Sequence, residues 1–204
     1  MSRQDHWSGI YETTEPGRVG WYQERPELSL ELIGKAGLAP DAPILDVGSG
    51  ASHLIDGLLE KGFSDISALD IAEAGLARTR ARLGGRADAI DWIVTDVTRW
   101  RPRRRYDLWH DRAVYHFLVD AEDRALYVDV LGQALKAGGA LVIASFALDG
   151  PEKCSGLPVH RHSEEMFEAE LGPAFELVES ARERHVTPSG GIQNYLYCRF
   201  RYLP

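Results

Sequence analysis

The sequence has few cysteines and no long apolar run. Cys154 and Cys198 are its only cysteines, and they stand far apart in a chain of 204 residues. This spacing argues against a disulfide framework and fits a reducing compartment. The apolar runs are no longer than a strand, and residues 1–9 lack the apolar core of a secretory signal. The sequence therefore predicts a cytoplasmic protein without a membrane-spanning segment.

An excess of positive charge is missing as well. The formal net charge is −8, whereas proteins that bind nucleic acid usually carry a basic surface. We therefore expect no nucleic-acid partner. The one basic stretch, residues 99–105, can be interpreted as a dock for an acidic partner or as a solvated connection. The second interpretation is favoured, because charged runs are usually solvated.

Short apolar runs alternate with amphipathic segments from residue 43 onward. The runs 43–47, 65–70, 90–94, 106–110 and 140–144 are predicted to be strands. Helices are expected between them, at 72–83 and from Asp120 to about Gly138, with Lys136 in the last turn. Residues 175–186 and 195–202 read as two strands joined by the turn 187–191. The pattern predicts an α/β fold of three layers, a doubly wound, mostly parallel seven-stranded sheet that ends in an antiparallel hairpin.

Nothing in the sequence divides the chain into separate units. Residues 1–40 are expected to form an N-terminal cover, with four aromatic side chains followed by a helix at 26–37. Residues 41–204 are expected to form the core. We see no internal repeat and no long linker, so the sequence predicts a single domain over residues 1–204.

A glycine-rich turn follows the first predicted strand. Gly48, Ser49 and Gly50 stand where a strand meets a helix, so the backbone there can approach a ligand closely. About twenty residues later, Asp70 and Ile71 end the second strand. A carboxylate in that place can accept hydrogen bonds from both hydroxyls of a ribose. The pair of features predicts a site for a cofactor that carries adenosine.

Charge favours one such cofactor over another. A dinucleotide site requires a third glycine where this chain has His53, and Asp46 would repel a pyrophosphate. S-adenosylmethionine has no phosphate and carries two positive charges. Asp96 and Val97 follow the third strand, where a carboxylate can accept from the adenine amino group. Three acids at three strand ends therefore predict S-adenosylmethionine as the cofactor.

These motifs resemble those of the class I, seven-stranded S-adenosylmethionine-dependent methyltransferases, which have a Rossmann-like fold. The resemblance implies that Asp46, Gly48 and Gly50 form the glycine-rich motif, that Asp70 binds the ribose, and that Asp96 and Val97 frame the adenine. The chain also resembles bacterial methyltransferases of unassigned substrate and the eukaryotic lysine methyltransferases of elongation factor 1A and citrate synthase. The likeness to these lysine methyltransferases is carried by 6–7, 11, 21–22, 62–63, 92 and 96–97. In these enzymes a basic residue follows the fourth strand, which implies that role for Arg112.

The acceptor side is less clearly marked. His110, Asp111 and His116 follow the fourth strand at the edge where the methyl group should point, so we consider them candidate catalytic residues and His116 a candidate base. The aromatic side chains of the cover could enclose the sulfonium by cation–π contact, and the same pattern also fits simple core filling; they are Trp7, Tyr11 and Trp21.

The predicted function is methyl transfer to a small molecule or to a protein lysine, by a monomer or a homodimer. An NAD-dependent oxidoreductase is the alternative from another enzyme class, and a module that binds the cofactor without activity is the other. Cys154, His160 and His162 are too few and too irregularly spaced for a metal site, so no metal is expected.

Overall fold

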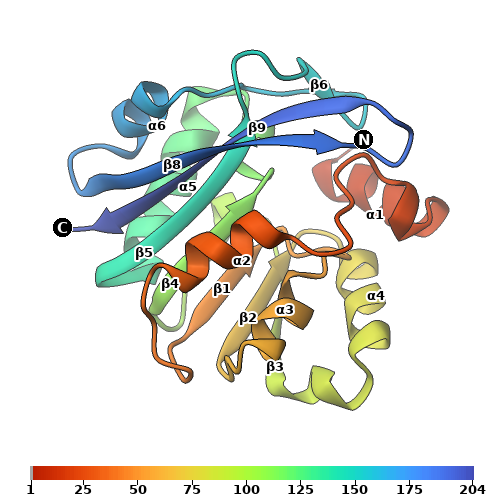
Figure 1. The fold of residues 1–204 in the computed structure, drawn as a ribbon, viewed down its shortest axis with the longest axis horizontal. Helices are drawn as coiled ribbons and strands as arrows, with labels where there is room; N and C mark the ends of the chain where they lie inside the picture. The colour runs from red at the N-terminus through yellow and green to blue at the C-terminus, as the bar shows by residue number, and fades with distance from the viewer. Residues whose placement is uncertain (1) are drawn as a thin grey trace.

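The computed structural model describes residues 2–204, in which seven strands form one sheet (Figure 1). The strand order is β3-β2-β1-β4-β5-β9-β8. The strands β1 to β5 pair in parallel, and β9 runs antiparallel to both β5 and β8. Their bounds are β1 Ile44–Val47, β2 Ile66–Asp70, β3 Ile90–Val94, β4 Tyr106–Arg112, β5 Leu135–Phe146, β8 Phe175–Val186 and β9 Ile192–Tyr202. A small second sheet pairs β6 (Lys153–Cys154) with β7 (Leu157–Pro158). The predicted fold class is confirmed.

Helices cover both faces of the large sheet (Figure 1). One apolar core cluster joins the sheet to α2, α3 and α4, and the other joins it to α5 and α6. The helices are α1 Arg3–Thr13, α2 Glu27–Gly34, α3 Leu54–Glu60, α4 Glu73–Leu83, α5 Ala121–Ala134 and α6 Glu164–Leu171. Four short 3-10 segments accompany them, η1 Pro16–Arg18, η2 Gly84–Ala89, η3 Val97–Arg99 and η4 Tyr115–Phe117.

Successive side chains of the parallel strands belong alternately to the two core clusters. In β1, Ile44 packs toward α2 and α3, whereas Leu45 packs toward α5. In β4, Leu108 and Trp109 divide in the same way. Successive side chains of a strand point to opposite faces, so a strand buried on both faces is mostly apolar. Residues 140–144 of β5 are apolar throughout for this reason, whereas the buried Asp46 interrupts β1 near its end.

The strand β1 lies at the point where the strand order reverses. It pairs with β2 on one side and with β4 on the other, and the helices that follow these strands lie on opposite faces. At such a point the loops after neighbouring strands part and leave a crevice at the carboxyl edge. In register, Asp46 of β1 stands beside His110 of β4. The glycine-rich turn therefore opens into this crevice.

Two elements differ from the expectation. The helix α5 ends at Ala134, so Lys136 and Gly138 lie in the irregular start of β5 and not in a helix. Gly138 has φ +81°, and the pairing of β4 with β5 shifts between Tyr106 and Leu108. Lys136 instead pairs with Asp107 at 2.8 Å. A lysine and a glycine after an apolar run thus mark a bulged strand entry as readily as a helix end. The predicted helix 26–37 is also shorter, ending at Gly34.

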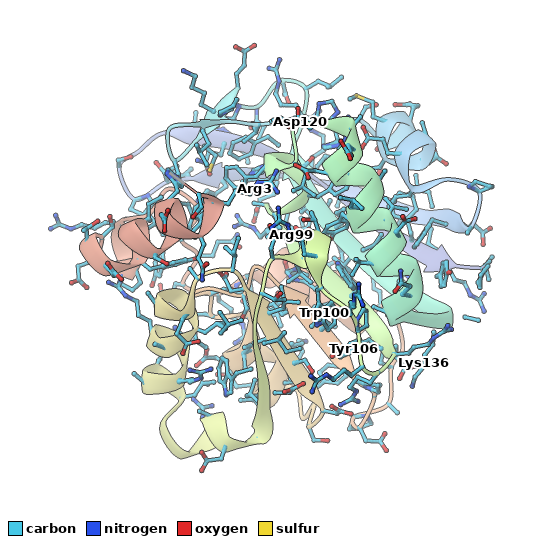
Figure 2. The ribbon with its side chains drawn as sticks, turned by 180° about the vertical axis from the view of Figure 1, so that it is seen from behind. Arg3, Arg99, Trp100, Tyr106, Asp120 and Lys136 are labelled. Carbon is cyan, nitrogen blue, oxygen red and sulfur yellow. The ribbon has the colours of Figure 1, made fainter. Side chains whose placement is uncertain are left out.

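The cover begins with a helix that the sequence analysis did not predict. The helix α1 starts at a capping box in which Ser2 and Asp5 exchange side-chain and backbone hydrogen bonds of 3.1 and 3.0 Å. It lies at the carboxyl ends of the parallel strands, next to α4 (Figure 1). Figure 2 shows Arg3 at its start, directed toward α5, where it pairs with Asp123. The packing against α4 and the ion pair with Asp123 fix α1 over the crevice.

The basic stretch connects η3 to β4 along the surface. Trp100 and Tyr106 lie side by side with ring centroids 6.3 Å apart, and both turn inward (Figure 2). Arg104 lies over the Tyr106 ring and pairs with Asp65. This packing agrees with the interpretation as a connection. Within residues 2–204, no helix is both long and apolar enough to cross a bilayer.

Candidate active site

The glycine-rich turn is built by two residues with left-handed backbone. Gly48 has φ +69° and Gly50 has φ +45°, a region in which a side chain is strained. The N–H groups of Gly48 and Ser49 both donate to the Leu69 carbonyl, at 2.7 and 3.1 Å, so the turn folds over the end of β2. A Cβ on Gly50 would come within 2.0 Å of the Tyr11 hydroxyl oxygen. Tyr11 of α1 is therefore seated directly on this turn.

A buried hydrogen-bonded chain runs beneath the turn. Asp46 Oδ1 lies 2.8 Å from His110 Nδ1, and His110 Nε2 lies 2.9 Å from Ser29 Oγ. A carboxylate only accepts, so Nδ1 donates to Asp46 and Nε2 accepts from the Ser29 hydroxyl. Asp46 Oδ2 and Ser49 Oγ are both buried and have no hydrogen-bond partner among residues 2–204. Buried polar atoms normally have partners, so these two atoms indicate a ligand site.

The carboxylate of Asp70 ends β2 beside the turn. Its Oδ1 accepts from the Ala72 N–H at 2.8 Å. Burial is the main cause that raises the pKa of Asp70, to about 7, and the negative charge of Asp46 adds to it. The backbone N–H groups of Ala72 and Gly50 act in the opposite direction. Burial disfavours the charged form of this carboxylate, so any further hydrogen-bond donor would stabilise it.

The third acid is held by its own turn. Asp96 caps η3, and its Oδ1 accepts from the Thr98 N–H and hydroxyl at 2.9 and 2.8 Å. Its Oδ2 lies 3.9 Å from Arg3 Nη1 of α1. The three predicted acids thus lie at the ends of β1, β2 and β3, at one edge of the sheet.

Two cavities meet at Gly48 under the N-terminal cover. The larger has a volume of about 110 Å³ and the smaller about 50 Å³. Aromatic rings roof the larger one, with Trp7 centred 4.8 Å from Phe117 and 5.7 Å from Trp21. Eleven of the twelve predicted cofactor residues line one cavity or both, namely Trp7, Tyr11, Trp21, Asp46, Gly48, Ser49, Asp70, Ile71, Asp96, Val97 and Arg112. Gly50, the twelfth, lies just behind, against Tyr11 and Asp70.

Arg112 is the buried cation of the site and lines both cavities. Its Nε donates to the Tyr197 hydroxyl at 2.7 Å, and its Nη1 donates to the Trp21 carbonyl at 3.0 Å. Its guanidinium lies 4.4 Å from the centre of the Tyr195 ring and 3.4 Å from Glu183. Arg112 therefore ties the cover segment to the C-terminal hairpin.

Comparison with known proteins identifies this arrangement. A family described as a methyltransferase domain matches residues 45–141. Malonyl-[acyl-carrier protein] O-methyltransferase 2 of Ilyobacter polytropus is 26% identical over 107 residues, 52% of this chain and 40% of that protein. The eEF1A lysine and N-terminal methyltransferase of Mus musculus is 24% identical over 150 residues, 70% of this chain and 21% of that protein. The chain thus spans less than half the length of these curated relatives.

Solved structures show the same fold. The 1,6-didemethyltoxoflavin-N1-methyltransferase of Burkholderia thailandensis, crystallised with S-adenosylhomocysteine, superposes with a TM-score of 0.74 at 23% identity, over 98% of this chain and 87% of that chain. Residues 45–141 thus match a methyltransferase domain, and the chain has the fold of S-adenosylmethionine-dependent methyltransferases. The predictions of family, fold and cofactor are confirmed, and the NAD-dependent oxidoreductase is not favoured.

The candidate catalytic residues of the methyltransferase lie away from the larger cavity. Both ring nitrogens of His110 are bonded to protein groups, as described above, and His110 lines only the smaller cavity. Asp111 and His116 line neither cavity. The backbone after the fourth strand therefore reaches the site, but none of these three side chains lines the larger cavity.

Asp111 supports the wall of the methyltransferase cavity. Its carboxylate accepts from the backbone N–H groups of Val114 and Tyr115, at 2.8 and 3.1 Å, and from the Tyr127 hydroxyl at 2.6 Å. Burial raises its pKa to about 6, although the hydrogen bonds from Tyr127 and Val114 lower it. These contacts hold the turn after β4, whose Ala113 has φ +74°. We conclude that Asp111 positions the chain that lines the cavity.

His116 is poorly suited to act as a base. It is fully buried, and burial lowers its pKa to about 3. Its Nδ1 accepts from the Phe146 N–H at 3.4 Å, while Nε2 has no partner among residues 2–204. A group with so low a pKa is a weak proton acceptor at neutral pH. This environment agrees better with a histidine that only packs in the core, an interpretation that the sequence could not distinguish from a base.

Replacing Tyr127 by Phe tests the supporting network. The Tyr127 hydroxyl donates to Asp111 and accepts from the Trp109 indole N–H at 2.8 Å, and all three groups are buried. We expect Tyr127→Phe to lower the free energy of unfolding by about 1–3 kcal/mol, because two buried polar groups lose a partner. Urea unfolding measures this loss. Tyr202→Phe is the matched control, because its half-buried hydroxyl makes one weak bond of 3.3 Å to Gly132. Equal losses in the two variants would contradict the assignment.

Several lining residues were not found from the sequence. They follow Arg112 in the chain or come from the segment after β5, and they include Val114, Phe117, Leu118 and Cys154. Their apolar character carries no chemical signal of its own, and only the packing of η4 and of the segment after β5 brings them to the cavity. Ser29 of α2 was also missed, although it completes the chain from Asp46 through His110.

Proposed function

We propose that this domain transfers a methyl group from S-adenosylmethionine to a small-molecule acceptor that needs no base from the protein. The observation that supports this most is the form of the larger cavity. It is roofed by aromatic residues of the chain's own N-terminal cover and lined on the acceptor side by apolar side chains.

The residues of the turn fit the cofactor. Among residues 2–204, Asp46 Oδ2 and Ser49 Oγ lack partners, and an ammonium group can donate to both. A phosphate at the same place would meet the Asp46 carboxylate, which it repels. We assign Asp70 to the ribose hydroxyls, and Asp96 with Val97 to the adenine. Trp7, Tyr11 and Trp21 would then face the sulfonium, and cation–π contact would favour its positive charge.

The acceptor has to arrive with a free lone pair. S-adenosylmethionine supplies an electrophilic methyl group, so the protein has to align the partners and exclude water. Apart from the two acids assigned to the nucleoside, the titratable groups that line the larger cavity are Arg3, Arg112, Tyr11 and Cys154. Burial raises the pKa of Tyr11 well above its usual value and that of Cys154 to about 11, so neither is ionised at neutral pH. A thiolate or a neutral amine would fit, because each is nucleophilic without a base.

The N-terminal cover argues for a small molecule rather than a protein lysine. The helix α1 is fixed by the Arg3–Asp123 ion pair and by Arg78, whose Nη1 donates to the Thr14 carbonyl at 2.8 Å. A lysine on a folded protein would have to displace this helix to reach the cavity. A small acceptor requires only a brief opening. We further place the enzyme in the cytoplasm, because Cys154 and Cys198 are both free thiols.

Methyl transfer to a cell lysate tests the proposal. The protein is incubated with lysate and S-adenosylmethionine labelled in its methyl group, and the products are separated by size. We expect label in the fraction below about 3 kDa, a size class typical of metabolites. Asp70→Ala should abolish the label, whereas Asp129→Asn, an exposed position on α5, should leave it unchanged. Label in protein alone would contradict the acceptor class. Calorimetry showing binding of NAD but not of S-adenosylmethionine would contradict the function itself.

A further inference from the structure

Two histidines and a glutamate meet on the far side of η4 from the larger cavity. His160 and His162 stand two residues apart on an extended segment, so their side chains point to the same face. Glu170 reaches them from the last turn of α6. One ligand atom from each residue lies within 4.8 Å of the other two. The methyltransferase reaction proposed above uses none of the three.

The spacing of these atoms suits zinc. His160 Nε2 lies 3.2 Å from Glu170 Oε1, and His162 Nε2 lies 3.2 Å from Glu170 Oε2. Zinc binds nitrogen and oxygen at about 2.0–2.2 Å in tetrahedral geometry, which places neighbouring ligand atoms about 3.3 Å apart. Two histidines with one glutamate are also a ligand set that zinc uses when one position stays open to water.

The surroundings of His162 match those of a metal ligand. His162 is fully buried, and its Nδ1 lies 3.0 Å from Ser145 Oγ, which can in turn donate to the Phe146 carbonyl at 3.1 Å. In the tautomer that donates from Nδ1 to Ser145, the lone pair of Nε2 faces the Glu170 carboxylate and is repelled by it. A cation bound between Nε2 and the carboxylate attracts both. Histidines that bind metals are commonly fixed by a hydrogen bond of this kind. Without a cation, the other tautomer donates from Nε2 to Glu170.

Two neighbouring side chains hold the Glu170 carboxylate. Tyr115 donates to Oε2 at 2.8 Å and Arg124 donates to Oε1 at 3.0 Å, so the carboxylate is fixed in place. The charge of Arg124 opposes a cation, but its Nη1 is also bonded to the carbonyls of Leu118 and Val119 at 2.8 Å.

We infer that His160, His162 and Glu170 form a binding site for one zinc ion, with water in the fourth position. The side chain of His160 is 29% exposed, which gives the ion and the water access from solvent. The His160 N–H donates to the His116 carbonyl at 2.7 Å, next to Phe117 of the cavity roof. Zinc would therefore pin the segment after β5, which carries Cys154, to η4 and stiffen the acceptor side of the cavity.

Titration of the chelator-treated protein with zinc chloride tests this inference, and the result does not depend on methyl transfer. We expect one zinc ion per chain and a rise of the melting temperature of at least about 5 °C at saturating zinc. Cobalt in place of zinc should give the intense visible absorption of a tetrahedral or five-coordinate site. Absence of zinc binding by the wild-type protein would overturn the inference.

Variants decide which residues hold the ion. His160→Gln is the primary variant, because this partly exposed side chain can be changed without disturbing the core, and Glu170→Gln is the second. Each should weaken zinc binding at least about 100-fold, because one of three ligands is lost. His53→Gln is the matched control, since His53 is partly exposed, like His160, and lies outside the cluster. Circular dichroism checks that each variant folds. Wild-type affinity in a folded His160→Gln protein would exclude this site.

Discussion

Replacing Asp70 by Asn is expected to weaken S-adenosylmethionine binding about 100-fold while it stabilises the free protein at pH 8. A neutral amide cannot match a charged carboxylate as an acceptor for two ribose hydroxyls, and a lost charge-assisted hydrogen bond costs about 2–3 kcal/mol. The Asn side chain still accepts from the Ala72 N–H that Asp70 Oδ1 bonds at 2.8 Å. The local backbone should therefore persist.

The gain in stability follows from the raised pKa of Asp70. Burial raises this pKa from 3.8 to about 7 in the folded protein. Below pH 3.8 the group is protonated in both states, and it lowers stability progressively as the pH rises to 7. Above pH 7 the full cost remains, about 4 kcal/mol for a shift of about three units. Asp70→Asn removes the charge, so urea unfolding at pH 8 should show a gain of about 2–4 kcal/mol.

The same pKa predicts how cofactor binding depends on pH. The ribose requires the ionised carboxylate, so the wild-type affinity should fall as the pH drops below about 7, by up to tenfold per pH unit. Affinity of Asp70→Asn should be flat over that range. Calorimetry between pH 5.5 and 8.5 measures both curves, with Asp129→Asn as the control. An unchanged affinity in Asp70→Asn would overturn the ribose assignment, and a loss of stability at pH 8 would overturn the charge argument.

The sequence revealed the parts of the fold in which the pattern of apolar and polar residues repeats over a few positions. The runs in β1 and β2 are mainly apolar because these strands are buried on both faces, whereas β3, at one end of the sheet, is only partly buried. An acid stands at or just after the end of each run and marks the carboxyl edge of the sheet. Asp46, Asp70 and Asp96 could therefore be placed at one edge without coordinates. The strand Phe175–Val186 was predicted with its observed bounds, because an alternating pattern and a Gly-Pro turn leave few other choices.

The parts that the sequence could not reveal depend on packing between distant segments. The pKa of His116 is lowered mainly by burial, to which Phe117 and Phe146 contribute, and no local pattern encodes this burial. Glu170 approaches His160 and His162 only because α6 packs against the segment that precedes it. The helix α1 carried a usable signal, since Ser2 and Asp5 have the spacing of a capping box. Its lack of an apolar stripe hid it.

Replacing Arg112 by Met is expected to cost stability and cofactor affinity together, by separable routes. The side chain of Arg112 is 10% exposed and bonds Tyr197, the Trp21 carbonyl and Glu183. Burial opposes its charge, yet the two tyrosines and Glu183 raise its pKa, so the cation is well compensated. Met keeps the volume and leaves Glu183 without its cation. We expect a loss of about 2–4 kcal/mol in the free energy of unfolding.

The second route runs through the cover. Arg112 is the donor that holds the Trp21 carbonyl, so its loss should loosen the aromatic roof and lower the cofactor affinity at least about tenfold. Arg112→Lys should resemble Arg112→Met, because an ammonium cannot span the same three partners. The double variant Arg112→Met with Glu183→Gln removes the unpaired charge. It should regain about half of the lost stability without regaining cofactor affinity.

A neighbouring ion pair supplies the matched control for this experiment. Arg199 bonds Glu179 at 2.8 Å across the same β8–β9 hairpin, is similarly buried, and lines neither cavity. Arg199→Met should therefore lower stability while leaving cofactor affinity at the wild-type value. Urea unfolding and calorimetry with S-adenosylmethionine give the two numbers for each variant. If the double variant recovers wild-type affinity, Arg112 acts only through the hairpin, and the proposed contact between cover and cofactor is wrong. If affinity stays low while stability returns, the buried cation orders the roof under which methyl transfer takes place.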